Sequence, residues 1–143
     1  NLDAFTLRFL KLAAHEIIPE QMTPQIDIDA VLDLQDINAK FMSELKKMKP
    51  FGPDNQKPVF CSLGVKDYGT SKLVGKDLEH IKLELIDDKS NTPIHGIAFG
   101  MHQHNTHIKN MKPFNICYTI EENTYNGNTS LQLMVKDIKE NDI

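Results

Sequence analysis

The sequence predicts an α+β protein in which helices and one short strand precede a part built of strands. Three observations predict this order. Apolar residues recur every three or four positions before residue 49, and they alternate with polar residues after residue 58. Between the two patterns lies a connector, residues 49–60, with three prolines and a glycine. Because proline fixes φ and lacks a backbone donor, this connector ends the helical pattern.

The N-terminal part is expected to hold two helices and a strand. Residues 2–18 form an apolar helical pattern that ends before a proline, and residues 24–31 alternate isoleucine with aspartate as a half-exposed strand does. Asp33 is suited to cap a second helix that ends at Pro50. We expect that helix to bury one stripe of side chains: Leu34, Ile37, Phe41, Leu45 and Met48.

Five segments after the connector show the two-residue period of strands: residues 59–66, 80–85, 94–99, 114–120 and 131–136. The Asn126-Gly127 pair predicts a tight hairpin between the last two, because both central residues of such a turn need positive φ. Residues 101–111 are expected as a loop or a short helix. Five strands with a polar insert after the third predict a five-stranded OB-like β-barrel. A sandwich would need more strands to cover both faces.

The charge distribution restricts the function. The net charge of -4 argues against a protein that wraps nucleic acid over its whole surface. Residues 40–76, however, hold eight lysines against three acids, while both flanking regions are acidic. A local basic surface is therefore expected on and just after the connector.

The two cysteines, Cys61 and Cys117, lie far apart without a CxxC spacing and no secretory signal is visible, which predicts buried, reduced thiols and a cytoplasmic location. No apolar run approaches the roughly 20 residues of a membrane span, so no membrane partner is expected. The chain begins at Asn1 within a helical pattern, which favours a piece of a longer protein.

Several stretches together resemble one known family. Residues 45–60 read LKKMKPFGPDNQKPVF, similar to the pattern L-x-P-F-G-x-G-N-P-x-P-x-F. Residues 80–83, 96–100 and 118–137 are similar in order to a His-Leu-Lys strand, a small-apolar-Phe-Gly strand and a terminal hairpin. These patterns belong to the C-terminal region of the RecJ family of single-stranded-DNA-specific exonucleases, in the DHH phosphoesterase superfamily. Asp54 and Gln56 depart from the pattern, so a role of its second glycine does not transfer.

This resemblance implies a domain division and a parent activity. Residues 1–54 would be the helical end of a DHHA1 domain with the connector, and residues 55–143 an OB-like nucleic-acid-binding domain. The parent enzyme would remove nucleotides from a 5′ end in DNA repair and recombination, using Mn²⁺ or Mg²⁺ in an upstream catalytic core. The Asp and His motifs of that core have no counterpart in this sequence. We therefore expect no catalytic residue and no cofactor here, and no hydrolysis by this chain alone.

The partners expected are single-stranded DNA and the upstream catalytic domains of the same chain. An OB-like domain binds single strands through lysines that attract phosphates and aromatic rings that stack on bases. The candidate residues lie in the first inter-strand connection, on the second strand, at the hairpin tip and on the last strand: Lys66, Tyr68, Lys72, Lys76, His80, Lys82, Tyr125 and Lys136. Lys49 and Lys57 of the connector are a weaker alternative, since prolines favour a structural role there.

The sequence leaves two other functions open for the strand-rich part. The barrel can instead be a protein-interaction module that docks on the enzyme core or on single-stranded-DNA-binding protein, and an unrelated tRNA-type OB domain is a remote third option. His102, His104 and His107 form a His-x-His-x-x-His pattern. No thiol or carboxylate is interleaved and the spacing matches no familiar zinc motif, so we predict no metal site.

Overall fold

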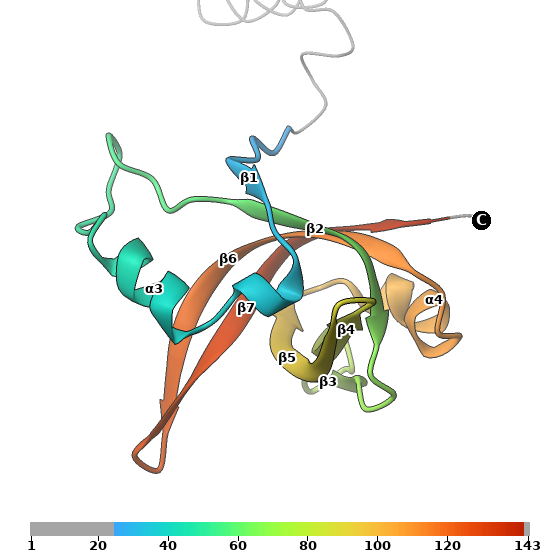
Figure 1. Cartoon of the computed structure of the whole chain (residues 1–143). Coiled ribbons are helices and arrows are strands. Elements are labelled where there is room, and N and C mark those ends of the chain that lie inside the picture. Colours follow the sequence, from blue (N-terminus) through green and yellow to red (C-terminus); the bar gives the residue numbers. More distant parts are fainter. Residues whose placement is uncertain (1–24, 142–143) are drawn as a thin grey trace, which may run out of the picture.

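The computed structural model describes residues 25–141, and the helix predicted over residues 2–18 lies outside them. The α+β class is confirmed. Within residues 25–141, a seven-stranded sheet carries two short α-helices and two 3-10 helices (Figure 1). The strands are β1 (Ala30–Val31), β2 (Phe60–Asp67), β3 (Lys72–Val74), β4 (His80–Asp87), β5 (Ser90–Ala98), β6 (Phe114–Tyr125) and β7 (Asn128–Glu140). The helices are η1 (Leu34–Asp36), α3 (Ala39–Lys46), η2 (His102–His104) and α4 (Asn105–Lys109).

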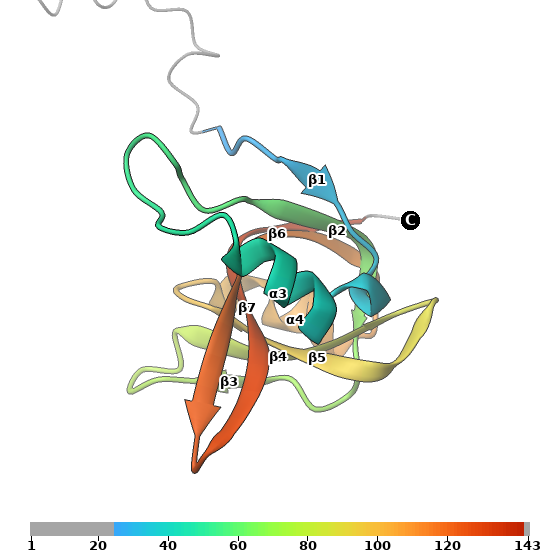
Figure 2. The same cartoon turned by 60° about the vertical axis from the view of Figure 1, so that its left-hand side comes forward.

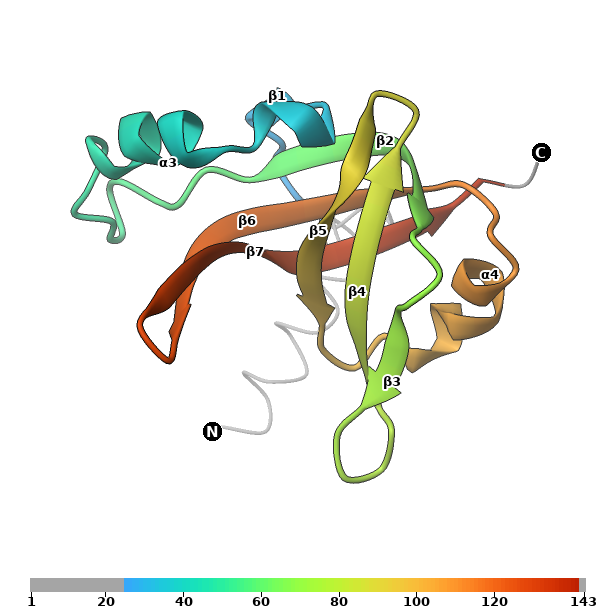
Figure 3. The ribbon, with the colours of Figure 1, turned by 60° about the horizontal axis from the view of Figure 1, so that its bottom comes forward.

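The five predicted strands pair in a ring. The sheet order is β1-β2-β6-β7-β5-β4-β3, and β2 also pairs with β4 through Lys66 opposite Ile86 and Asp67 opposite Leu85. Strands β2, β6, β7, β5 and β4 therefore each have a neighbour on both sides (Figure 3). Strand β5 runs parallel to β7 and β1 runs parallel to β2, while the other pairs are antiparallel.

The interior of the ring is the apolar core. Strand residues alternate between the two faces of a sheet, so every second side chain points inward. The fully buried side chains show this period on β4, where Ile81, Leu83 and Leu85 have no exposed surface. Other strands contribute the remaining large buried residues: Val65, Phe114, Ile116, Tyr118 and Leu133.

Helices close both ends of the core. Figure 2 shows the ring of strands viewed down its axis, with α3 in front of the ring and α4 behind it. Leu34 and Leu45 from η1 and α3 enter the core at one end, and Ile108 from α4 enters it at the other. The helical segment before the connector and the strands after it therefore share one core.

The helix predicted to start at Asp33 begins later, so this prediction was wrong. Asp33 makes no capping hydrogen bond, and Ile37 is extended, which interrupts the helical pattern. The cap of α3 is Asn38, whose Oδ1 accepts a hydrogen bond from the Phe41 N–H at 3.0 Å. The buried stripe also shifts, because Met48 is 49% exposed and Met42 is buried in its place.

Several other boundaries differ from the predictions. The strand expected within residues 24–31 is reduced to β1, which is exposed, and β3 was not predicted. Residues 101–111 contain the short helices η2 and α4, one of the two expected outcomes. The predicted hairpin is confirmed, with φ of 50° at Asn126 and 78° at Gly127. The outer halves of β6 and β7 project from the ring as a two-stranded arm (Figure 3).

The connector folds into a closed turn. Gly52 and Asn55 exchange two backbone hydrogen bonds of 2.8 and 3.0 Å. The Asn55 amide also donates to the carbonyl oxygens of Met48 and Pro50, at 2.7 and 2.8 Å. Lys57 Nζ forms an ion pair with Glu121 Oε1 of β6, at a distance of 2.8 Å. Asn55 thus fixes the turn through its side chain and its backbone.

Candidate nucleic-acid interface

The outer face of β3, β4, β5 and β7, which points away from the core, carries a continuous row of side chains. Lys72 lies opposite Lys82, Lys82 lies opposite Ile97, and Ile97 lies opposite Met134. Residues directly opposite each other across strands share one face of the sheet. The sequence-predicted Lys72 and Lys82 are therefore brought together, next to two apolar side chains.

The opposition of Lys72 and Lys82 is unusual for a sheet surface. Like charges directly opposite each other on antiparallel strands are destabilising, with their Cβ atoms about 4.5–5.5 Å apart. Neither ammonium group forms an ion pair with any residue in the part of the chain that the structure describes. An anion placed over the two groups would relieve their repulsion.

His80 and Phe99 form an aromatic pair next to this row. The two rings are nearly perpendicular, with centroids 5.0 Å apart and an interplanar angle of 77°. The Gly100 N–H donates to His80 Nδ1 at 2.9 Å, so the Nε2 atom carries the proton and faces Glu79 at 3.1 Å. These contacts fix the His80 ring and leave Phe99 57% exposed.

The other end of β4 lies close to further predicted residues. Lys66 lies opposite Ile86, and the Tyr68 N–H donates to the Glu84 carbonyl oxygen at 2.8 Å. The Tyr68 side chain is exposed. An acid, Glu84, also lies on this face, where its carboxylate accepts a hydrogen bond from Thr70 and lies 3.3 Å from His95 Nδ1.

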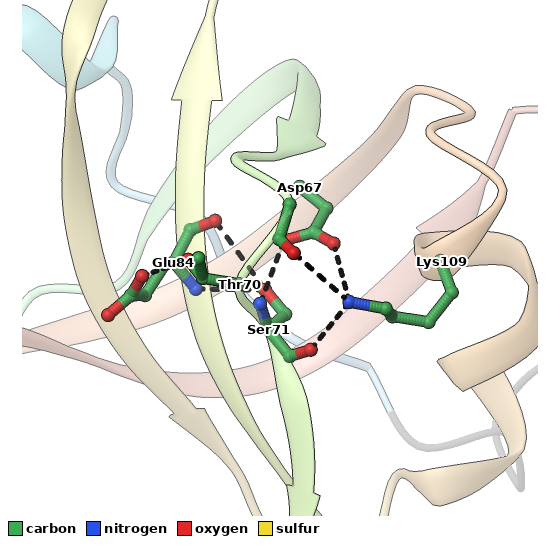
Figure 4. Close-up of polar contacts among 6 residues, drawn as sticks. Asp67, Thr70, Ser71, Glu84 and Lys109 are labelled. Atoms are coloured by element: carbon green, nitrogen blue, oxygen red, sulfur yellow. Dashed lines mark hydrogen bonds and ion pairs between the residues drawn. The ribbon is translucent and has the colours of Figure 1, made fainter.

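An ion pair between a buried Asp67 and a partly exposed Lys109 anchors the loop that follows β2 (Figure 4). Asp67 is fully buried at the end of β2. It accepts hydrogen bonds from the Ser71 N–H at 3.0 Å and from Lys109 Nζ of α4 at 3.2 Å, and Lys109 also donates to the Ser71 carbonyl at 2.8 Å. Burial opposes ionisation, but hydrogen bonds from Ser71, Gly69 and Lys109 outweigh it and hold the pKa of the Asp67 carboxyl below its ordinary value.

The lysines of the described residues fall into two groups. One group forms ion pairs with carboxylates: Lys46, Lys47, Lys57, Lys89 and Lys109. The lysines of the other group make no ion pair within residues 25–141. This group includes all five lysines that were predicted to bind nucleic acid: Lys66, Lys72, Lys76, Lys82 and Lys136. Their charge is available to an external anion.

Three predicted residues lie away from the row. Lys76 is exposed in the turn between β3 and β4, and Lys136 is exposed on β7 where the pairing with β6 shifts register. Tyr125 is 75% exposed at the tip of the β6–β7 arm. It lies six positions beyond Thr119, the partner of Met134, which corresponds to about 20 Å along a strand.

Two of the three histidines, His104 and His107, lie beside one carboxylate. His104 Nδ1 and His107 Nδ1 face the two carboxylate oxygens of Glu140, at 2.8 and 3.5 Å, and His107 Nε2 donates to the Pro113 carbonyl at 2.9 Å. Within residues 25–141, no group of three His, Cys, Asp or Glu side chains is arranged to hold a metal ion. No helix in the same range is long and apolar enough to cross a membrane.

Comparison with known proteins identifies the family. A family model described as the RecJ OB domain matches residues 28–137. The chain belongs to the RecJ OB domain family. Crystal structures of RecJ from Thermus thermophilus, in complex with Mg²⁺ and with Mn²⁺, share the fold with a TM-score of 0.71 at 17% identity. Each match covers 99% of this chain, but it covers only 20% of the RecJ chain with Mg²⁺ and 19% of the RecJ chain with Mn²⁺. This chain therefore spans about a fifth of the length of the solved RecJ chains. No match was found among curated proteins.

The RecJ resemblance found in the sequence is thus confirmed, while the division at residue 54 and the DHHA1 assignment stay predictions. On this RecJ OB domain, the sequence alone pointed to Lys72, Lys82 and His80 but not to Phe99. The signal for Phe99 was present, because buried Ala98 and the alternation of β5 require its neighbour to point outward.

Proposed function

We propose that this RecJ OB domain binds single-stranded DNA across the outer face of β3, β4 and β5. The observation that carries the proposal is the pair of directly opposed lysines, Lys72 and Lys82, with no acidic partner among the described residues and with Phe99 and His80 beside them. In this proposal the five-stranded ring acts as an OB barrel, whose strands and first connection form the binding surface.

Each side chain has a physical role in the proposed complex. Lys72, Lys82 and Lys66 neutralise phosphates, and the exposed rings of Phe99 and Tyr68 stack on bases, each stack contributing about 1–3 kcal/mol. His80 supports Phe99 through their edge contact. Such contacts read the backbone and the π-faces of bases, so binding is expected to tolerate many sequences.

The mechanism proposed for this chain is holding rather than cutting. In the longer protein, the OB domain would hold a single strand while an upstream core with Mn²⁺ or Mg²⁺ hydrolyses it from the 5′ end. A role in DNA repair and recombination belongs to the same proposal. Asp67 and Lys109 would act indirectly, because they fix the loop from which Tyr68 and Lys72 extend.

The proposal predicts salt-dependent binding that needs the paired lysines. Fluorescence anisotropy with a labelled single-stranded oligonucleotide, titrated at several salt concentrations, gives the affinity and its salt slope. The double variant Lys72→Glu/Lys82→Glu should weaken binding by about tenfold or more and lower the slope by about 0.7 for each phosphate that is no longer neutralised.

The double variant Lys40→Glu/Lys139→Glu is the matched control, because both lysines are exposed and neither forms an ion pair within the described residues. It makes the same kind of charge reversal away from the proposed face. Equal weakening of binding in the control and in Lys72→Glu/Lys82→Glu would show a general charge effect. Absence of any binding by the wild type at low salt would refute the proposal.

A protein-interaction role is supported by a separate feature, the projecting β6–β7 arm. Its outer half, residues 122–130, is exposed, and no lysine occurs between residues 113 and 135. The arm therefore suits a protein partner, such as the enzyme core or single-stranded-DNA-binding protein, better than a phosphate backbone. Under this second proposal, Tyr125→Ala weakens partner binding and leaves oligonucleotide affinity unchanged.

A further inference from the structure

The structure brings the two cysteines together. Cys61 of β2 lies directly opposite Cys117 of β6, although three other strands and two short helices separate them in the sequence. Their neighbours Phe60 and Tyr118 point into the core, so both thiols lie on the outer face of the sheet. Both cysteines are free thiols.

The backbone pattern shows which type of pair they form. The Cys61 carbonyl accepts a hydrogen bond from the Leu32 N–H at 2.8 Å, so it points toward β1 and away from β6. The N–H and C=O groups of one strand residue point to the same side, and Cys61 and Cys117 are therefore a non-hydrogen-bonded pair. Cα atoms in such pairs are about 4.5 Å apart. Disulfides require a Cα separation of about 4.4–6.8 Å, so this pair can be bridged without moving either strand.

The thiols are shielded but reachable. Cys61 is 6% exposed, whereas Cys117 is half-buried. Burial, the hydrogen-bonded Cys61 thiol beside it and Asp137 opposite it on β7 raise the pKa of Cys117 to about 11. The Cys117 thiol is therefore protonated at neutral pH, and oxidation becomes faster as pH rises and more Cys117 thiolate forms.

We propose that Cys61 and Cys117 are a redox-active pair that forms an intrachain disulfide by exchange with a low-molecular-weight disulfide. The half-buried Cys117 thiolate attacks one sulfur of the small disulfide, forms a mixed disulfide and releases one small thiol. The Cys61 thiolate then attacks the Cys117 sulfur and releases the second small thiol. Two electrons pass from the cysteines to the small disulfide, and the two cysteine protons go to the released thiolates or to water.

The bridge would join two strands of the ring at a point away from the proposed DNA-binding face. It would close a chain loop that contains β3, β4, β5 and α4. Oxidation is therefore expected to raise resistance to unfolding and to leave oligonucleotide affinity unchanged. Formation of the bridge does not depend on the proposed DNA binding.

The test measures how strongly the fold favours the bridge. The 143-residue protein is equilibrated in buffers of reduced and oxidised glutathione, once natively and once in concentrated urea. Alkylation and mass spectrometry then quantify free thiols, mixed disulfide and the cross-linked peptides. The equilibrium constant for forming the bridge should be about tenfold or more higher in the native protein than in the unfolded chain. The reason is thermodynamic linkage: if the bridge stabilises the native state, the native state stabilises the bridge by the same free energy.

Two variants assign the roles of the thiols. Cys61→Ser should stop at a mixed disulfide on Cys117, and Cys117→Ser should leave buried Cys61 unmodified; circular dichroism confirms that both variants fold. A native equilibrium constant equal to or below that of the unfolded chain would overturn the proposal, as would accumulation of mixed disulfide in the wild type. The opposite pattern of modification in the two variants would overturn Cys117 as the attacking thiol.

Discussion

Asp67 shows how a buried charge can be stabilised at a strand end. The carboxylate has no exposed surface, and it is compensated by the Ser71 N–H and by Lys109 from α4. Lys109 is itself bound to the Ser71 carbonyl. The three residues join the end of β2, the following loop and α4 by contacts between charged and polar atoms, and thereby place Tyr68 and Lys72.

Replacing Asp67 by Asn tests this contact. The variant keeps the shape but removes the charge, and we expect a loss of about 2 kcal/mol in the free energy of unfolding at neutral pH. Urea denaturation of both proteins measures the difference. Asp77→Asn is the control, since Asp77 is exposed in a turn. An equal effect of both substitutions would contradict a special role of Asp67.

The same contact predicts a dependence on pH. The folded-state pKa of Asp67 is lowered, so its stabilisation is complete above the unfolded pKa near 4 and is lost as pH falls through the lower folded value. The stability difference between the wild type and Asp67→Asn should therefore shrink below about pH 4. A difference that stays constant with pH would show that the carboxylate charge contributes nothing.

Contacts between residues that are distant in the chain, such as this ion pair, cannot be predicted from local sequence patterns. Lys109 and Asp67 are 42 positions apart, and no local pattern links them. The opposition of Cys61 and Cys117 likewise depends on strand register. The outward position of His80 and Lys82 was predictable, because the period of a strand places alternate residues on the solvent face. Lys72 was expected in a connection between strands, and its place on β3 was not predicted.

At the scale of elements, α3 shows where local patterns mislead. Apolar residues recur at helical spacing from Leu34 onward, but the backbone becomes extended at Ile37 and Asn38 before the helix starts. Both Asp33 and Asn38 are suitable cap residues by type. The structure shows which of them caps α3, and it also places the Leu34 N–H on Asp87 Oδ2 at 2.8 Å, a contact between residues 53 positions apart that no local pattern indicates.

A pair of alanine substitutions separates the two caps. Asn38→Ala should reduce the free energy of unfolding by about 1 kcal/mol, because it removes the acceptor for the Phe41 N–H. Asp33→Ala should have a much smaller effect, since it removes only an exposed ion pair with Lys89 that solvent screens. Thermal or urea denaturation gives both values. A larger loss of stability for Asp33→Ala than for Asn38→Ala would show that Asp33 is the capping residue, as the sequence suggested.

The strands were the most predictable elements. All five segments with alternating apolar residues are strands of the ring, and the Asn-Gly turn is at the predicted position. Strand β3 was missed because three residues are too few to show a period, and β1 is short and exposed. Such edge strands are determined by the backbone of their neighbour rather than by their own sequence.

At the scale of the whole molecule, the ring closes where β5 meets β7. Only three residue pairs join these strands, and Gly96 opposite Leu133 is the central one. A Cβ atom at Gly96 would lie 3.3 Å from the Leu133 carbonyl oxygen and 3.4 Å from its Cβ. The absence of a side chain at residue 96 lets the two strands approach.

Gly96→Ala tests this closure. We expect a loss of about 1–2 kcal/mol in the free energy of unfolding, because the added methyl group crowds the Leu133 backbone. Gly52→Ala is the control, since an added Cβ there meets nothing within 4 Å. Urea denaturation compares the two variants. Equal stability of both would show that β5 and β7 can separate slightly without cost.

The position of β7 between β6 and β5 also affects how the protein is made. On a ribosome the strands emerge in the order β2, β4, β5, β6 and β7, so β5 and β6 each have an unpaired edge until residues 132–134 are released. Unpaired strand edges are sites of aggregation. Closure also joins residues far apart in the chain, which slows folding. The nascent domain therefore depends on its last strand, which covers both open edges in one step.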